Sequence, residues 1–383
     1  MDMKTVAKRY ISLDVLRGIT VAMMIVVNNP GSWAAVYPML RHAEWNGCTP
    51  CDLVFPFFLF CVGVSMAFAL AKYDSLNSSS LGKIFKRGAL LYLVGLLMTG
   101  FPFYNTQPDP SLNFWQNWLV WLSELRLVGV LPRIALCYVA ASCLALWLKS
   151  PKKIVCAIGV LSLLHISLLL IFGGTEGALT LEGNFAGKVD IAVFGSSHIY
   201  HGYGIPFDPE GLLGVLTGSC TVLIGYLTGQ FIRRSSIQDT VSASAETSAL
   251  GITSRIFVQS AFLLLGGMVL NIWIPLNKPL WSVSYVLYAA GWASFVLALM
   301  IYLIDYKGWQ RIFLPFKALG MNALVLFVLS GLLVKINWTY IGWDYVAIFG
   351  GTEFKSLLFA LMYLVLHLLI AVIMYKKKIF IKL

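Results

Sequence analysis

The sequence contains little charge. Only 12% of its 383 residues are Asp, Glu, Lys or Arg, whereas 59% are hydrophobic. A soluble domain could not bury so much apolar sequence in its core, and long apolar runs recur throughout the chain. We therefore expect an all-α polytopic membrane protein, a bundle of about ten or eleven spanning helices.

Acidic residues are fewer than basic ones, with 17 Asp and Glu against 28 Lys and Arg. A basic excess can indicate a nucleic-acid partner, but here it stands in short clusters between apolar runs, so we expect none. The clusters lie at residues 4–9, 72–87, 149–153, 233–255, 307–317 and 376–382. They alternate with segments poor in Lys and Arg. The positive-inside bias then predicts that both termini are cytoplasmic and that residues 26–65 lie on the outer side.

The chain shows no internal repeat, and its polar first residues, 1–12, give no sign of a cleavable signal peptide. We expect a single domain over residues 1–383, with a mobile cytoplasmic linker in the small polar segment 235–251. Ten apolar runs are long enough to span a bilayer. They cover residues 13–29, 52–71, 84–101, 127–148, 153–172, 210–232, 255–274, 281–304, 313–335 and 354–375.

Two other outer segments have patterns of their own. The second half of residues 101–121 is rich in aromatic side chains and predicts a short amphipathic helix at the membrane interface. Residues 173–210 form the longest outer loop, in which the alternating stretch VDIAVF at 189–194 is typical of a strand. We expect this loop to form an ordered cap.

The outer segment 26–65 gathers polar and titratable side chains on a backbone that cannot form a continuous helix. The residues that break it are Pro30, Gly31, Pro38, Gly47 and Pro50. His42 is the leading catalytic candidate, because an imidazole can accept or deliver a proton near neutral pH, or act as a nucleophile. Asp52, at the start of the next apolar run, could hold its second nitrogen, as a carboxylate does in a triad. A packing role for an interfacial histidine is the alternative.

The remaining four histidines of the chain are weaker candidates. His198 and His201 lie in an aromatic loop and are more typical of substrate contacts. His165 and His367 lie in apolar runs, where a buried structural role is expected.

Several polar side chains fall within the apolar runs, where they are costly and are functional candidates by default. They are Asp14, Arg17, Asn28, Arg133 and Asn322. Asp14 and Arg17, three residues apart, could simply pair along one helix face. Two arginines that face one bundle interior require an anion, and a phosphate-bearing ligand would supply it.

Cysteine is present in seven copies, but only Cys48 and Cys51 have the spacing of a redox pair or of half a metal site. No second cysteine pair exists to complete a zinc site, and a membrane thiol oxidoreductase usually needs a second dithiol. We expect either a structural disulfide or two free thiols, and no metal ion.

Long motifs resemble one known family. The stretches SLDVLRGITVAMMIVVNNPGSW from residue 12 and HAEWNGCTPCDLVFPFFLFCVGVS from residue 42 are similar to the heparan-alpha-glucosaminide N-acetyltransferase family of transmembrane acyltransferases. The resemblance continues in GVLPRIALCY, FDPEGLLG, NKPLWSVSYVLY and ALGMNALVLF, and so covers nearly the whole chain. It implies transfer of acetyl from cytosolic acetyl-CoA to the amine of a glucosamine-type sugar on the far side of the membrane.

The resemblance also implies roles for individual residues. The family's catalytic histidine falls on His42, with Asp52, Asn28 and Asn46 as further catalytic candidates. Arg17, Arg133 and Asn322 are expected on the path of the donor. The acceptor sugar is expected to contact Trp45, His201, Tyr203, Asp208, Trp281, Ser284 and Tyr285. For Asp208 the alternative is a helix-capping role together with Glu210, and for the last three an interfacial aromatic belt.

Two features depart from the animal enzymes of this family. The Cys48/Cys51 pair is not typical of them, and their long luminal N-terminal domain is missing. Short loops indicate a bacterial member of the inner membrane, whose catalytic loop is expected to face the periplasm and whose acceptor is expected to be a cell-wall or scavenged amino sugar. The resemblance implies a homodimer. A transporter of an anionic solute and a thiol–disulfide oxidoreductase are the alternative functions. A carrier would show an inverted repeat and broken helices, and the sequence predicts neither.

Overall fold

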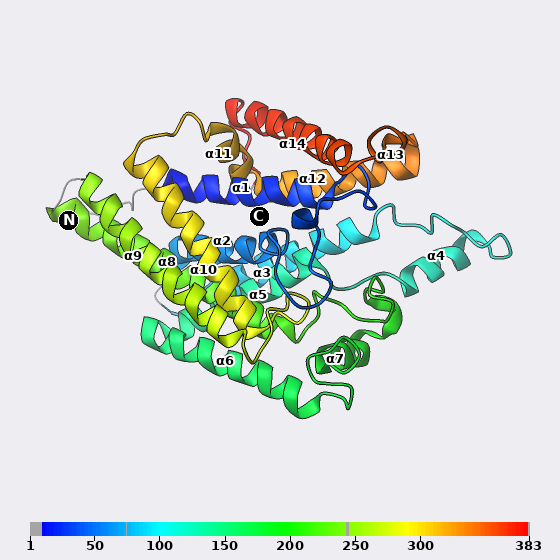
Figure 1. The fold of residues 1–383 in the computed structure, drawn as a ribbon, viewed down its shortest axis with the longest axis horizontal. Helices are drawn as coiled ribbons and strands as arrows, with labels where there is room; N and C mark the ends of the chain where they lie inside the picture. Colours follow the sequence, from blue (N-terminus) through cyan, green and yellow to red (C-terminus); the bar gives the residue numbers. More distant parts are fainter. Residues whose placement is uncertain (1–9, 74, 243–244, 382–383) are drawn as a thin grey trace.

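A computed structural model describes residues 10–73, 75–242 and 245–381 of the chain (Figure 1). For residues 236–242 and 245–248 it describes the backbone only. The described part of the chain is helical and contains no strand. The long helices are α1 (Ile11–Asn28), α2 (Val54–Ala69), α3 (Ser78–Gly100), α5 (Val130–Leu148), α6 (Pro151–Phe172), α8 (Gly214–Ser242), α9 (Ala245–Leu270), α10 (Val283–Met300), α12 (Ala323–Ile336) and α14 (Glu353–Lys376). The short ones are α4 (Phe114–Ser123), α7 (Phe185–Phe194), α11 (Leu314–Met321) and α13 (Tyr345–Phe349).

These helices confirm the predicted membrane bundle. Among the described residues, nine helices are long and apolar enough to cross a bilayer. A tenth predicted span corresponds to α3, whose first half carries Lys83, Lys86 and Arg87. Most of the predicted linker 235–251 belongs to the adjoining ends of α8 and α9, while residues 243–244 lie outside the described part of the chain.

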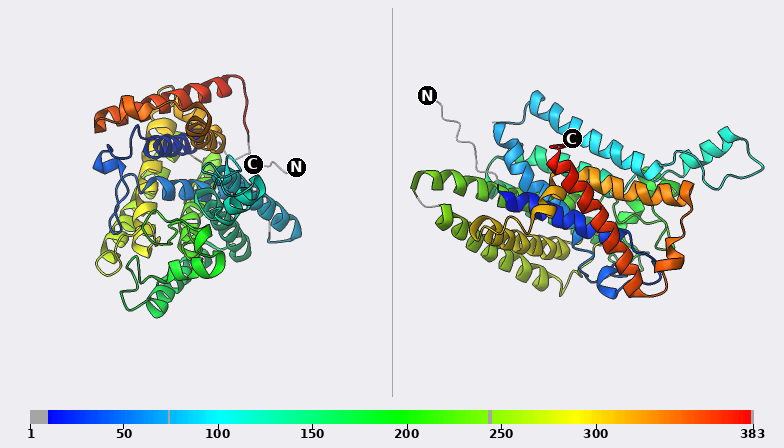
Figure 2. Two further views of the ribbon diagram at one scale, coloured as in Figure 1. Left: turned by 90° about the vertical axis from the view of Figure 1, so that its right-hand side faces the viewer. Right: turned by 90° about the horizontal axis from the view of Figure 1, so that it is seen from above.

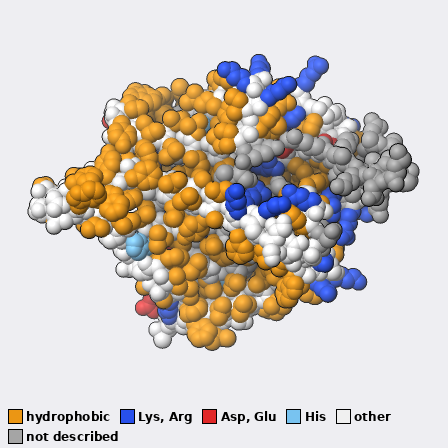
Figure 3. Space-filling model, turned by 180° about the vertical axis from the view of Figure 1, so that it is seen from behind, with side chains coloured by type: hydrophobic (Ala, Val, Ile, Leu, Met, Phe, Trp, Pro, Cys, Tyr) orange, Lys and Arg blue, Asp and Glu red, His pale blue; other side chains and the backbone are white. Residues whose placement is uncertain are grey.

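The long helices run broadly alongside one another (Figure 2). Helix α2 packs most extensively against α8 at the centre, α9 against α10, α1 against α11, and α3 against α5. Helices α6 and α14 lie on opposite faces of the bundle and are mostly exposed, with apolar side chains outward (Figure 1). Hydrophobic side chains cover the middle of the molecule, and Lys and Arg gather toward one end, the basic end (Figure 3). Since α1 and α2 are joined at the opposite end, that end is called the His42 end.

The predicted span 313–335 is interrupted at Asn322, which separates α11 from α12. The apolar run by itself did not predict this break. The Asn322 side chain donates to the carbonyl of Ile379 at 3.0 Å and accepts from the backbone N–H of Ile381 at 3.0 Å, so it holds the end of the chain against the helix break. Helix α11 also approaches α1 closely, because a Cβ at Gly18 or Gly320 would overlap the backbone of the facing helix.

The two patterned outer segments have different outcomes. The amphipathic helix predicted in 101–121 is present as α4, which begins at an Asn113 capping box and exposes aromatic side chains. The strand predicted at 189–194 is wrong, because these residues belong to α7. Asn184 accepts a hydrogen bond from the backbone N–H of Gly187 and so caps that helix, which the alternating pattern alone did not reveal.

Candidate active site

His42 lies in the loop that joins α1 to α2. As the prolines and glycines predicted, this loop contains only one short 3₁₀ turn, Pro38–Leu40, before the backbone folds into consecutive turns that lead into α2. His42 Nδ1 lies 2.7 Å from Asp52 Oδ1. The His42 side chain is 49% exposed, whereas that of Asp52 is 1% exposed. The loop therefore sets a buried carboxylate behind an accessible imidazole.

Asp52 is held by the backbone of its own loop. Its second oxygen, Oδ2, accepts from the N–H of Ala43 at 3.1 Å, and from both the N–H and the hydroxyl of Thr49 at 3.0 and 3.1 Å. Its carbonyl oxygen accepts a 2.6 Å hydrogen bond from the hydroxyl of Tyr285 in α10. These contacts fix the carboxylate in position and leave Oδ1 for the imidazole.

The charge state of Asp52 determines the tautomer of His42. Burial by itself would raise the pKa of Asp52, but the hydrogen bond with His42, the nearby ammonium of Lys278 and two backbone N–H groups lower it to about 2. An ionised carboxylate only accepts hydrogen bonds, so the proton of a neutral His42 is on Nδ1. Its Nε2 then carries the free lone pair, which is the arrangement a general base requires.

A segment that precedes α10 supports this loop from the other side. The Gly47 N–H donates to the carbonyl of Leu276 at 2.7 Å. The Asn277 side-chain amide donates to the carbonyl of Trp45 at 3.1 Å and to Asn46 Oδ1 at 3.2 Å. Asn277 and Asn46 are 231 positions apart in sequence, so only the tertiary fold brings the two segments together.

Lys278, in that same segment, contacts both His42 and Asp52 and was not among the predicted site residues. Its Nζ lies 3.0 and 3.2 Å from the two ring nitrogens of His42 and 3.6 Å from Asp52 Oδ1. The only available signal was its position in the quoted motif NKPLWSVSYVLY, which does not assign it a role.

The two predicted asparagines differ in their surroundings. Asn28 is the last residue of α1 and is exposed. Asn46 is also exposed, but its Oδ1 is held by Asn277, next to Lys278. Asn46 and His42 are therefore contacted by neighbouring residues of the same segment, Asn277 and Lys278.

The predicted aromatic acceptor contacts form a cluster at the His42 end. The Trp45 ring meets Tyr203 and Phe207 edge-on, with centroids 6.0 and 5.4 Å apart. The indole N–H of Trp45 donates to the carbonyl of Leu179 at 2.8 Å, so this side chain is anchored. His201 lies exposed in the adjoining turn.

Asp208 is a structural residue in this conformation. Its two carboxylate oxygens accept from the Arg126 guanidinium at 2.7 and 2.6 Å, and also from the backbone N–H groups of Tyr200 and Glu210. Glu210 accepts from the same guanidinium at 2.6 Å. Asp208 and Glu210 thus act together, as in the alternative to acceptor binding, but they bind one arginine instead of capping a helix.

Trp281, Ser284 and Tyr285 do not line a surface open to an acceptor. All three are fully buried, at 0% exposure. The Trp281 indole N–H donates to the Thr221 hydroxyl, and the Ser284 hydroxyl donates to the carbonyl of Pro275. These three residues lie behind the His42 loop, and their contact with the acceptor stays a prediction.

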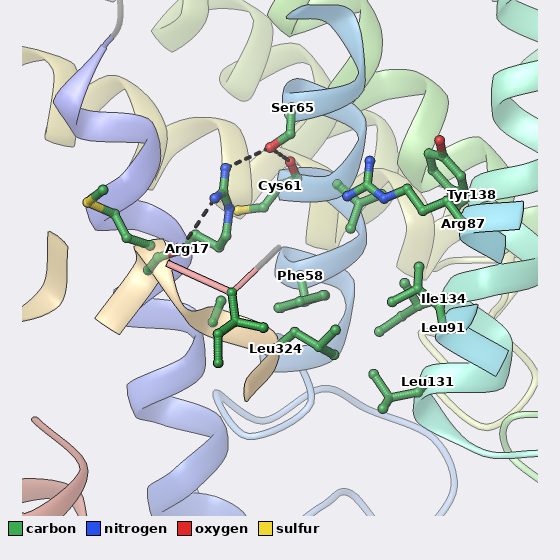
Figure 4. Close-up of a pocket in the computed structure, with 15 residues that line it drawn as sticks. Arg17, Phe58, Cys61, Ser65, Arg87, Leu91, Leu131, Ile134, Tyr138 and Leu324 are labelled. Atoms are coloured by element: carbon green, nitrogen blue, oxygen red, sulfur yellow. Dashed lines mark hydrogen bonds between the residues drawn. The ribbon is translucent and has the colours of Figure 1, made fainter. Parts of the chain in front are cut away.

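The arginines predicted to share one anion lie in different surroundings. Arg17 lines a cavity of about 330 Å³ between α1, α2, α3 and α5, where it donates to the Ser65 hydroxyl at 2.9 Å (Figure 4). Arg87 lines the same cavity from the other side of α2. Arg133 is outside this lining; it is buried 4.5 Å above the ring of Trp281 and donates to the carbonyl of Pro209. Arg17 therefore shares its cavity with Arg87 and not with Arg133.

Two further polar candidates have structural partners. Asp14 Oδ1 lies 3.5 Å from the Arg17 guanidinium, as expected for a pair three residues apart on one helix. Asn322 holds the end of the chain, as described above, and adjoins the Arg17 cavity through its neighbours Met321 and Ala323.

Cys48 and Cys51 are free thiols in the His42 loop. Burial, as the main cause, raises the pKa of each to about 12. A thiol of so high a pKa is a poor nucleophile near neutral pH, which argues against redox catalysis. Cys51 Sγ lies 3.3 Å from His42 Nδ1 and packs against the imidazole.

Comparison with known proteins agrees with these motifs. Residues 9–176 match the family described as "Heparan-alpha-glucosaminide N-acetyltransferase, catalytic". The chain is 28% identical to the heparan-alpha-glucosaminide N-acetyltransferases of Homo sapiens and Mus musculus, over 96% and 98% of its length. It spans 59% and 60% of the length of these relatives. The match that contains His42 and the similarity over nearly the whole chain agree with the resemblance that the motifs indicated: the chain is similar to the heparan-alpha-glucosaminide N-acetyltransferases.

Proposed function

We propose that this protein transfers acetyl from acetyl-CoA to the amine of a glucosamine-type amino sugar at the His42 end of the bundle. The observation that carries the proposal is the pair formed by His42 Nδ1 and the buried Asp52 carboxylate, 2.7 Å apart, which leaves Nε2 as the proton acceptor. The names of the two relatives, each an N-acetyltransferase that acts on a glucosaminide, support the type of reaction.

In the proposed reaction, His42 acts as the general base. As the sugar amine attacks the thioester carbon, Nε2 takes the proton that the amine must lose. The C–S bond then breaks, and the imidazolium returns this proton to the departing thiolate of coenzyme A. Asp52 stays ionised throughout and stabilises the transient imidazolium.

Asn46 is the better placed of the two asparagines to steady the oxyanion. Its Oδ1 already accepts from Asn277, so its amide N–H groups point away from that contact and can donate. Deleting one such donor typically costs about 2.7 to 4 kcal/mol of transition-state stabilisation. Asn28, exposed at the end of α1, is the second candidate for the same role.

The donor is proposed to occupy the cavity that Arg17 and Arg87 line, with its phosphates toward the basic end. Ser65, which holds Arg17, is eleven residues into α2 from Val54, or about 16 Å of helix rise. An extended pantetheine arm covers a distance of that order, so the thioester would approach His42 at the start of α2. The two guanidinium groups supply the charge that phosphates need.

The acceptor is proposed to approach from the open side of His42. The anchored Trp45 ring, Tyr203 and the exposed His201 offer aromatic and hydrogen-bonding surface there. The periplasmic orientation of this end, the bacterial inner membrane and a homodimeric assembly belong to the same proposal, and rest on the basic clusters and the family resemblance.

The test uses purified full-length protein, radiolabelled acetyl-CoA and a panel of amino sugars that includes glucosamine. We expect the wild type to acetylate at least one of them, and His42→Ala to lose transfer while it still binds acetyl-CoA. Glu44→Ala, an exposed neighbour in the same loop, is the matched control and should stay active. An inactive wild type across the panel, or an active His42→Ala, would contradict the proposal.

The same assay separates direct transfer from an acetyl-enzyme. Without acceptor, direct transfer in a ternary complex leaves no label on the protein. Label trapped on His42 would instead indicate an acetyl-imidazole intermediate and a ping-pong mechanism. We favour direct transfer, because an acetyl-imidazole on a half-exposed side chain would be open to hydrolysis.

A further inference from the structure

Lys278 places a positive charge against the face of the His42 ring. Its Nζ lies 3.0 Å from Nδ1 and 3.2 Å from Nε2. An atom almost equidistant from both ring nitrogens cannot lie in the ring plane along either lone pair, because it would then overlap the carbon between them. The ammonium therefore lies over the ring and leaves the in-plane lone pair of Nε2 open.

The backbone around Lys278 holds this ammonium in place. The carbonyl of Lys278 accepts from the Trp281 N–H at 3.0 Å, and Asn277 exchanges hydrogen bonds with the backbone and hydroxyl of Ser282 at 3.0 Å. Asn277 also binds the His42 loop through Trp45. The Lys278 side chain is only 14% exposed, so its charge is poorly screened by water.

Two charges of opposite sign then act on the imidazole. The Asp52 carboxylate in the ring plane favours the protonated form of His42, and the Lys278 ammonium over the ring opposes it. Without the ammonium, a buried carboxylate at 2.7 Å would favour an imidazolium, which cannot accept a proton.

We propose that Lys278 is a positioning residue of the acetyl-transfer site, whose ammonium, in contact with the His42 ring and with the Asp52 carboxylate, opposes protonation of the imidazole and so favours the form that can accept a proton. This inference rests on the proposed function only for its catalytic consequence. Its electrostatic core, that Lys278 opposes protonation of His42, is a property of the protein without substrate.

The other titratable groups near His42 do not supply this effect. Those that surround the pair are Cys48, Cys51, Tyr203 and Tyr285, from the loop itself, the outer cap and α10. Burial raises the pKa of both thiols to about 12, so they are neutral over an assay range around neutrality. Asp52 and Lys278 are the two charged groups in contact with the His42 ring, whereas Arg41 and Glu44, its charged neighbours in the same loop, are exposed to solvent.

The direct test follows the reaction of His42 with diethyl pyrocarbonate, which acylates a histidine side chain only when its imidazole is neutral. The rate of modification is measured by mass spectrometry of the His42 peptide as a function of pH, in the intact protein without substrate. We expect Lys278→Met to move the midpoint for His42 upward by about 1 to 2 pH units, because a like charge at contact distance is removed. Lys278→Arg, which keeps the charge, should have a midpoint close to that of the wild type.

Two controls isolate the effect. Lys188→Met removes a positive charge from α7 and should leave the His42 midpoint unchanged. The exposed His201 is an internal reference in every variant. Lys278→Gln provides a second neutral variant if Lys278→Met does not fold. An unchanged His42 midpoint in a folded neutral variant would overturn the inference.

The catalytic consequence is measured separately. The acid limb of the pH profile of kcat/KM should move to higher pH by the same amount as the modification midpoint, so that the defect of Lys278→Met relative to the wild type becomes smaller as the pH rises. A merely structural defect would lower the rate without such a recovery and would contradict the positioning role. If the wild type transfers acetyl to no amino sugar, the proposed function fails, and the modification experiment still decides the electrostatic inference.

Discussion

Replacing Asp52 by asparagine should reverse the tautomer of His42. Oδ2 of Asp52 accepts from two backbone N–H groups, those of Ala43 and Thr49. An asparagine must therefore place its amide oxygen there, because an NH₂ group would face two donors. Its NH₂ group then points at His42 Nδ1, which must accept, so the ring proton moves to Nε2. The nitrogen that faces the substrates would lose its lone pair.

The expected loss follows from removal of the general base. Base catalysis contributes about 10²- to 10⁴-fold, and loss of the correct tautomer in a comparable pair costs up to about 10⁴ in kcat. At about 1.4 kcal/mol for each factor of ten, this corresponds to roughly 3 to 5 kcal/mol of barrier. The assay is acetyl transfer from radiolabelled acetyl-CoA at saturating acceptor, together with acetyl-CoA binding, which should not change.

The matched control is Thr49→Val. It removes the hydroxyl that bonds Oδ2 at 3.1 Å but keeps the backbone N–H at 3.0 Å, so the orientation of the carboxylate and the tautomer should persist. A loss of less than about tenfold is expected for this variant. If a folded Asp52→Asn kept the wild-type kcat, the tautomer argument and the assignment of His42 as base would both be refuted.

Four other outcomes are expected. Arg17→Ala should weaken acetyl-CoA binding by about 1.5 to 3 kcal/mol in a titration, through loss of a charge-assisted hydrogen bond, and unchanged affinity would remove it from the donor site. Changing Cys48 and Cys51 together to serine should preserve most of the transfer, since their pKa values of about 12 leave no thiolate to react; a complete loss would revive a thiol mechanism. Trp45→Ala should raise the acceptor KM more than the donor KM in steady-state kinetics, and the reverse pattern would assign it to the donor side. Because the pKa of Asp52 is lowered from 3.8 to about 2, its ionisation should stabilise the fold by about 2 kcal/mol above pH 4. That stability should disappear as the pH falls through 2, so thermal unfolding of wild type and Asp52→Asn should converge there and not at neutral pH.

The sequence alone determined the helical class and the positions of the spans, and it predicted the pairing of His42 with Asp52. Each of these depends on short-range information. Spans follow from runs of apolar residues that the bilayer requires. The pairing of His42 with Asp52 follows from their closeness in one loop whose prolines and glycines allow the chain to turn back. The same local reasoning failed at residues 189–194, where an alternating pattern was compatible with a capped helix.

Only the tertiary structure decided which distant residues reach the site. Lys278 is 236 positions from His42 and contacts it because Asn277 joins the two segments. The burial of a single side chain cannot be read from the sequence either, so Trp281 is predicted at a surface but is fully buried just before α10. Likewise, whether Arg87 or Arg133 shares a cavity with Arg17 depends on how each helix is rotated about its own axis. The packing of whole helices, which sums many weak contacts across the chain, sets that rotation, and no short stretch of sequence encodes it.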